Sequence, residues 1–182
     1  MKMSNSPSVV LVNRRVVIND ACCLIDLHKV GLIQPMLGLP FNFHVALPVR
    51  ANELLSISAM EWASYERAGM QTIDLPGDQV ATALSLREAH PTLSAEDCFS
   101  LVLARETRNG LLLTGDAALR EVAEHTFGLE VHGVLWVADL IVEHGVLSKE
   151  HVCRCLEEWQ EDPLVRLPHR QIAARITNWR KR

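Results

Sequence analysis

The chain has 182 residues, of which 48% are hydrophobic and 22% are charged, and its formal net charge is −4. This length predicts one folded domain with at most an appended segment, and this composition excludes an intrinsically disordered chain. No apolar run is long enough for a membrane span and residues 1–8 lack a signal-peptide pattern, so we expect a cytoplasmic protein that does not contact membranes.

The charge is unevenly distributed along the chain. Residues 163–182 contain six basic and no acidic side chains, so the remainder of the chain is more acidic than the net charge indicates. Such a basic end is typical either of a solvated helix or of a surface that contacts phosphates or an acidic partner, and both interpretations stay open. We expect a domain over residues 1–160 and a basic C-terminal helical tail over residues 161–182.

The five cysteines are an odd number without the spacing of a disulfide framework, which favours reduced thiols. His151 and Cys155 share one face of an expected helix, but no second pair of this kind accompanies them. A structural zinc site is therefore not expected.

Short apolar segments alternate with helical patterns along the chain. Strands are expected at residues 16–19, 45–47, 71–75, 111–113 and 129–131, with a possible lead-in strand at 9–12. Helices are expected at residues 21–27, 49–68, 78–90, 94–109, 117–123, 134–143 and 149–159, with a last helix after Pro168. This alternation predicts an α/β fold with three layers and a mostly parallel central sheet of about five strands.

Four carboxylates are expected at one edge of this sheet. Asp20 and Asp116 directly follow strands, while Glu53 and Asp97 lie in the first turns of helices that start at the same edge. Each of them alone has a structural explanation: Asp20 and Asp116 as helix N-caps, Asp97 as the partner of Ser94 in a capping box, and Glu53 as a favourable charge near a helix N-terminus. Together they repel one another, and that repulsion is tolerated best when a hard cation such as Mg²⁺ or Mn²⁺ neutralises it.

Other α/β families that place an aspartate after a strand require residues that this chain lacks. A haloacid-dehalogenase-type phosphatase needs Asp-x-Asp after its first strand, where this chain has Asp20-Ala21-Cys22. A dinucleotide-binding fold needs a Gly-x-Gly-x-x-Gly turn, which the sequence does not contain.

The ordered set of acidic motifs resembles the PIN-domain superfamily, and most closely the small VapC-type ribonuclease toxins of type II toxin–antitoxin pairs. The residues that carry the resemblance are Val17-Ile18-Asn19-Asp20, Pro48 with Glu53-Leu54, Ser94-Ala95-Glu96-Asp97, and Leu112-Leu113-Thr114-Gly115-Asp116. Residues 131–136 and 145–147 are similar to a predicted nucleic-acid-binding subgroup of the same superfamily.

The resemblance implies an endoribonuclease that depends on Mg²⁺ or Mn²⁺. Asp20, Glu53, Asp97 and Asp116 would bind the metal, with Glu96 as the alternative to Asp97. Thr114 would orient Asp116 or a metal-bound water. The implied partners are an RNA substrate, an antitoxin protein and a second copy of the chain in a homodimer.

One position departs from the family pattern. The family usually carries Ser or Thr directly after the first aspartate, whereas Ala21 and Cys22 follow Asp20 here. This departure predicts a metal site with less hydrogen-bonding support. It leaves open an alternative function, in which a PIN-like protein with weak or no catalytic activity binds nucleic acid or a protein partner.

Overall fold

The structure is a computed structural model that describes residues 14–181, so the possible strand at residues 9–12 lies outside the described part. Its centre is a five-stranded sheet with the order β3-β2-β1-β4-β5, and the pairing of every neighbouring strand is parallel. The strands are β1 (Val16–Asn19), β2 (Asn42–Ala46), β3 (Met70–Ile73), β4 (Gly110–Leu113) and β5 (Val131–His132). The predicted parallel α/β sheet is thereby confirmed.

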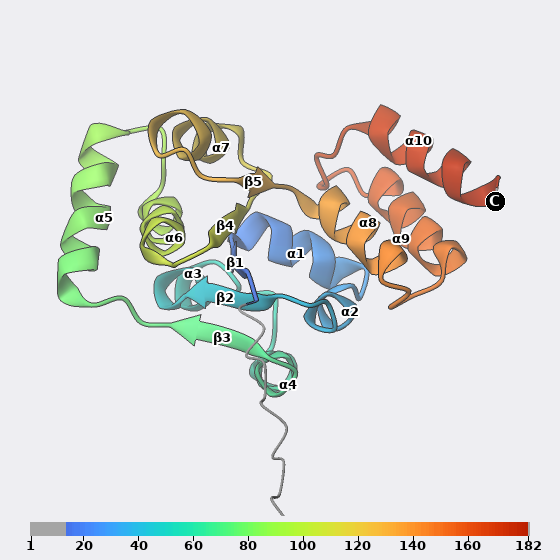
Figure 1. Cartoon of the computed structure of the whole chain (residues 1–182), viewed down its shortest axis with the longest axis horizontal. Helices are drawn as coiled ribbons and strands as arrows, with labels where there is room; N and C mark the ends of the chain where they lie inside the picture. Colours follow the sequence, from blue (N-terminus) through green and yellow to red (C-terminus); the bar gives the residue numbers. More distant parts are fainter. Residues whose placement is uncertain (1–13, 182) are drawn as a thin grey trace, which may run out of the picture.

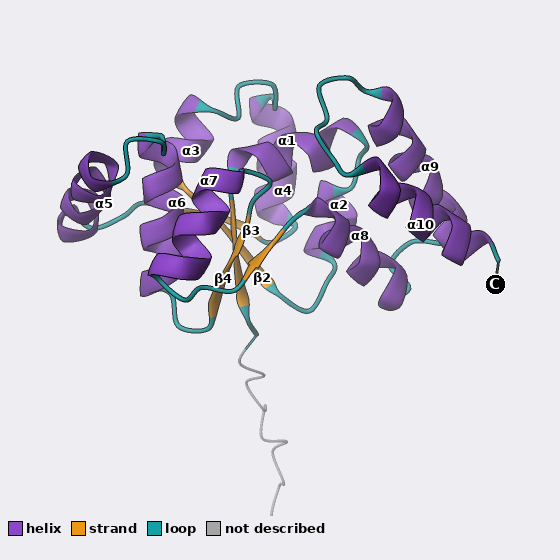
Figure 2. Cartoon of the chain, turned by 90° about the horizontal axis from the view of Figure 1, so that it is seen from above, coloured by secondary structure: helices purple, strands orange, loops and turns teal. Residues whose placement is uncertain are grey.

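Helices cover both faces of the sheet and form the outer layers. They are α1 (Ala21–Lys29), α2 (Ile33–Leu37), α3 (Leu47–Asn52), α4 (Ala59–Arg67), α5 (Gly77–Ala89), α6 (Ala95–Glu106), α7 (Ala117–Glu121), α8 (Val134–Glu143), α9 (Lys149–Glu161) and α10 (His169–Arg180), with a π-helical turn at Val122–Thr126. Helices α5, α6 and α7 lie on one side of the sheet, and α8, α9 and α10 lie on the other (Figures 1 and 2). The helix α6 packs on β4, β1 and β2, so its nearly continuous apolar surface forms part of the core.

The expected single helix over residues 49–68 is wrong. Helix α3 ends at Asn52, and α4 begins only at Ala59. The reason is a capping box, in which the backbone N–H of Ser58 donates to Glu61 at 2.9 Å and the backbone N–H of Glu61 donates to the Ser58 hydroxyl at 3.3 Å. Glu53 consequently lies at the C-cap of α3 and not in the first turns of a helix.

Two expected strand boundaries also differ from the structure. Strand β2 begins at Asn42, because Asn42–His44 pair with β1, and Leu47 already belongs to α3, which has a proline in its first turn. Strand β5 is limited to Val131–His132, which pair with the last two residues of β4.

The C-terminal helix is docked on the body of the protein. Val165 and Ile172 are buried, and α10 packs along α9. Arg175 forms a bidentate ion pair with Asp139 of α8 at 2.8 and 2.7 Å, and Arg180 lies 2.7 Å from Glu157 of α9. Removal of residues 163–182 would therefore expose core side chains, so point substitutions are the cleaner test of the basic surface. None of the helices in the described part of the chain is long and apolar enough to cross a lipid bilayer.

Candidate active site

The carboxyl ends of β1 and β4 place the first site residues side by side. The pairing of Asn19 with Leu113 continues as a hydrogen bond from the backbone N–H of Asp20 to the Leu113 carbonyl at 3.0 Å. The residues that follow the two strands, Asp20 and Thr114, therefore leave the sheet next to each other.

Asp20 is buried, with 3% of its surface exposed, and both of its carboxylate oxygens accept hydrogen bonds. Oδ1 accepts from the backbone N–H of Ala21 at 2.8 Å, and Oδ2 accepts from the Thr114 hydroxyl at 2.7 Å and from the Cys22 thiol at 2.9 Å. Burial raises the pKa of Asp20, the charge of Asp97 adds to this rise, and the hydrogen bonds from Cys22, Thr114 and Ala21 oppose it.

The support from Cys22 corrects the expectation from sequence. Cys22 lies in the first turn of α1, and its sulfur also accepts the backbone N–H of Gly115 at 3.2 Å. The thiol thus occupies the role that was expected of a hydroxyl directly after Asp20, and the prediction of a poorly supported carboxylate is wrong. The available signal was a polar side chain two residues after the aspartate, in the first turn of a helix that starts at the sheet edge.

Thr114 connects Asp20 to the turn that carries Asp116. The Thr114 side chain is fully buried, donates its proton to Asp20 and accepts the backbone N–H of Asp116 at 3.0 Å. Asp116 is exposed and is the N-cap of α7, where its Oδ1 accepts the backbone N–H of Leu119 at 2.8 Å. The hydroxyl of Thr114 therefore positions the Asp20 carboxylate through its proton and the Asp116 backbone through its oxygen.

Glu53, Glu96 and Asp97 approach this edge from α3 and α6. The predicted capping box at the start of α6 is confirmed, because Asp97 accepts the backbone N–H of Ser94 at 2.6 Å and its own N–H donates to the Ser94 hydroxyl at 2.9 Å. Glu96 accepts a hydrogen bond at 2.8 Å from Asn52, the last residue of α3.

Electrostatic coupling identifies which of these acids lie near one another. Burial raises the pKa of Glu53 to about 7, and the charges of Asp20, Glu96 and Asp97 contribute to this rise. Asp116 is not among the groups that raise the pKa of Glu53 or of Asp20. The structure therefore brings Asp20, Glu53, Glu96 and Asp97 into one acidic cluster, and Thr114 links Asp116 to it.

The chemistry of this acidic cluster fits a hard divalent cation. Its donors are all carboxylate oxygens, which Mg²⁺ and Mn²⁺ prefer, and their mutual repulsion is the kind that a cation relieves. Within residues 14–181, however, no group of three or more His, Cys, Asp or Glu side chains converges closely enough to hold a metal ion. The donor atoms are thus of the right chemical type, but no three of these side chains in the described residues are placed to bind one ion.

Comparison with known families identifies the family of this fold. The chain matches DUF3368, a PIN domain, over residues 16–181. It belongs to the PIN-domain family. PIN domains are in general nucleases that use divalent metal ions. The match extends through α10, and a search of curated proteins found none that matches this PIN domain.

Glu53→Gln is expected to raise the thermal stability of the metal-free PIN domain near pH 8 and to change it little near pH 5. The pKa of Glu53 rises from 4.5 to about 7 on folding, so this group favours the folded state below pH 4.5 and loses that contribution as the pH rises through about 7. Because Glu53 is only half-buried, we expect a gain of roughly 1 kcal/mol at the higher pH, or about 2–4 °C in melting temperature.

Thermal unfolding in EDTA at the two pH values measures this effect. Glu88→Gln, a change at an exposed residue of α5, is the matched control. Its melting temperature should equal that of wild type at both pH values. Equal melting temperatures of wild type and Glu53→Gln near pH 8 would contradict the electrostatic coupling of the acidic cluster.

Proposed function

We propose that this PIN domain is a Mg²⁺- or Mn²⁺-dependent endoribonuclease, and that it acts as the toxin of a type II toxin–antitoxin pair. The observation that carries the proposal is the acidic cluster at the carboxyl edge of the sheet, in which burial and neighbouring carboxylates raise the pKa of Glu53 to about 7. A helix cap accounts for one acid at a time, whereas a cation site explains why the charges of Asp20, Glu96 and Asp97 raise the pKa of Glu53 at the same edge.

The proposed metal ligands are Asp20, Glu53, Asp97 and Asp116, with Glu96 as the alternative to Asp97. When bound, a divalent ion would supply an activated water and would stabilise the attacking and leaving oxygens as the phosphodiester is hydrolysed. Thr114 and Cys22 hold the Asp20 carboxylate in one orientation and favour its ionised form despite its burial. Glu53 is the group whose protonation changes near neutral pH, so it releases its proton when a cation neutralises the cluster.

Cleavage of single-stranded RNA by the purified protein is expected to require added Mg²⁺ or Mn²⁺ and to stop in excess EDTA. The reason is that carboxylates without a cation repel the phosphate and cannot generate a nucleophile from water at neutral pH. Restoring the metal should restore cleavage, as measured by gel analysis of end-labelled RNA of mixed sequence. Asp20→Asn protein prepared in parallel controls for contaminating nucleases, and cleavage that persists in EDTA would contradict the metal-dependent mechanism.

A second candidate function is a binding module that retains the PIN fold without cutting RNA. Two observations favour it: no three acidic side chains converge on a metal position within residues 14–181, and Asp116 caps α7 while exposed. Absence of cleavage with both metals, together with measurable RNA binding, would support this alternative.

The proposed partners follow from the toxin function. Two exposed apolar side chains, Leu55 and Met60, lie in and just after the loop that follows Glu53, with 76% and 82% of their surfaces exposed. We propose that a second copy of the chain or an antitoxin covers the surface around this loop, where burial of Leu55 and Met60 would remove apolar area from water. Co-expression with the product of an adjacent reading frame tests whether a protein associates there.

A further inference from the structure

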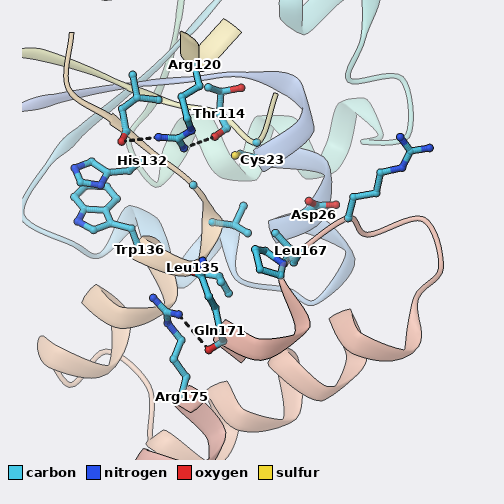
Figure 3. Close-up of a pocket in the computed structure, with 16 residues that line it drawn as sticks. Cys23, Asp26, Thr114, Arg120, His132, Leu135, Trp136, Leu167, Gln171 and Arg175 are labelled. Atoms are coloured by element: carbon cyan, nitrogen blue, oxygen red, sulfur yellow. Dashed lines mark hydrogen bonds between the residues drawn. The ribbon is translucent and has the colours of Figure 1, made fainter. Parts of the chain in front are cut away.

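A pocket of about 450 Å³ lies beside the acidic cluster, on the side of β5 (Figure 3). It is bounded by α1, the ends of β4 and β5, the first turn of α8 and the segment that leads into α10. Thr114 and Gly115 line it, so the turn that supports Asp20 on one side forms a wall of this pocket on the other. Its volume lies within the range of ligand-binding pockets, roughly 300–1,000 Å³.

Three arginines from separate parts of the chain line the pocket: Arg120, Arg166 and Arg175. Arg120 is held in place by the carbonyl oxygens of Val131 and Thr114 at 3.0 and 3.2 Å, and Figure 3 shows it across the pocket from Arg175. Arg166 is exposed and makes no hydrogen bond or ion pair with any residue that the structure describes. One guanidinium group is thus free to bind an anion, and two others are oriented by the protein.

Some of the surrounding charge opposes an anion, but the balance of the lining residues is basic. Arg120 pairs with Glu124 at 2.9 Å, and Arg175 pairs with Asp139, so these two cations are partly neutralised. Asp26 is the one carboxyl group among the described lining residues, and although burial raises its pKa to about 6, it is mostly ionised at neutral pH and opposes an anion there. Arg166 therefore dominates the recognition of an anionic group.

Rigid aromatic and apolar surface completes the pocket. The ring of Trp136 stacks on His132 with a centroid distance of 4.2 Å and an interplanar angle of 10°, and it meets Phe41 edge-on at 5.5 Å. Leu135 and Leu167 add apolar surface to the lining. A nucleobase needs such a flat or apolar surface for stacking, while its phosphate needs cationic donors.

We propose that this pocket binds one nucleotide of a single-stranded RNA, next to the phosphodiester held at the acidic cluster. The phosphate contacts Arg166, and the base lies against Trp136, Leu135 and Leu167. Two features of the molecule support this occupant. The pocket and the acidic cluster share the Thr114-Gly115 wall, and an acidic cluster that repels phosphates requires a neighbouring basic surface to retain the strand. This inference rests on the proposed function in RNA, and it adds a subsite to it.

Binding of a short fluorescein-labelled single-stranded RNA, followed by fluorescence anisotropy in EDTA, tests the subsite. Arg166→Glu should weaken binding about tenfold. Arg166→Ala should make the fall of log affinity with log salt concentration less steep, by about one in the slope. Trp136→Leu should also weaken binding about tenfold through the loss of stacking. Because Arg166 is exposed, its variants should keep the melting temperature of the wild type.

Arg108→Ala is the control, since Arg108 is an exposed arginine that precedes β4 at the opposite end of the sheet. Unchanged affinity and salt dependence in both Arg166 variants would overturn the proposal. Unchanged RNA binding combined with weaker binding of an oligoglutamate peptide would assign the pocket to an acidic protein partner and overturn it as well. EDTA prevents metal-dependent cleavage during the measurement, so the binding assay does not depend on nuclease activity. If the protein binds RNA through Arg166 but does not cleave RNA with added metal, only the proposed nuclease activity is refuted.

Discussion

Asp20→Asn is expected to lower RNA cleavage roughly a thousandfold, because it removes the buried negative charge at the centre of the acidic cluster. The asparagine oxygen can still accept the N–H of Ala21, and the Thr114 hydroxyl can rotate to accept from the new amide. Loss of the charge also relieves the repulsion with Asp97 and Glu53. The variant should therefore remain folded in EDTA.

Initial cleavage rates in Mn²⁺ and melting temperatures in EDTA measure the two parts of this prediction. Asp78→Asn, which changes an exposed carboxylate in the first turn of α5, is the matched control and should cleave at the wild-type rate. An independent readout is Glu53: its pKa should fall towards 4.5 in Asp20→Asn, because the charge of Asp20 is one of the causes that raise it. Wild-type cleavage by Asp20→Asn would exclude Asp20 from the active site.

Thr114→Val should reduce cleavage about 10–100-fold, the effect typical of residues that orient a metal ligand. Valine has a similar shape but neither donates to Asp20 nor accepts the N–H of Asp116. Loss of these two hydrogen bonds should also lower the free energy of unfolding by about 1–3 kcal/mol, since both bonds are buried or partly buried.

The pH dependence of cleavage distinguishes this role from a purely structural one. The hydrogen bond from Thr114 lowers the pKa of Asp20, so its removal raises that pKa further. As the pH is lowered, Thr114→Val should therefore lose cleavage activity at a higher pH than wild type does. Thr114→Ser keeps the hydroxyl and should restore both the rate and the pH profile. If Thr114→Val and Thr114→Ser lose the same rate and both keep the pH profile of wild type, the substitutions have disturbed only packing.

Local sequence signals were sufficient for the elements that begin or end abruptly. The apolar runs before Asp20 and Asp116 end in residues that start helices, and Ser94 with Asp97 forms the capping box that the pattern predicted. They failed at residues 53–58, where helical periodicity continues across a turn. There the Ser58-x-x-Glu61 capping box was the stronger signal, because a satisfied N-terminus begins a new helix whatever the periodicity before it.

The sequence by itself determined the class of fold, the order of the strands along the chain, and that Asp20 and Asp116 directly follow buried strands. Buried strands and their terminal acids depend on neighbours a few residues away, so local patterns are enough. Only the tertiary structure decided that the Thr114 hydroxyl donates a hydrogen bond to the Asp20 carboxylate, 94 residues away in the chain, and that the Cys22 thiol donates to the same carboxylate. It also decided that α10 packs on α9 and lines a basic pocket together with β5, because such contacts depend on packing between distant segments, which no local pattern encodes.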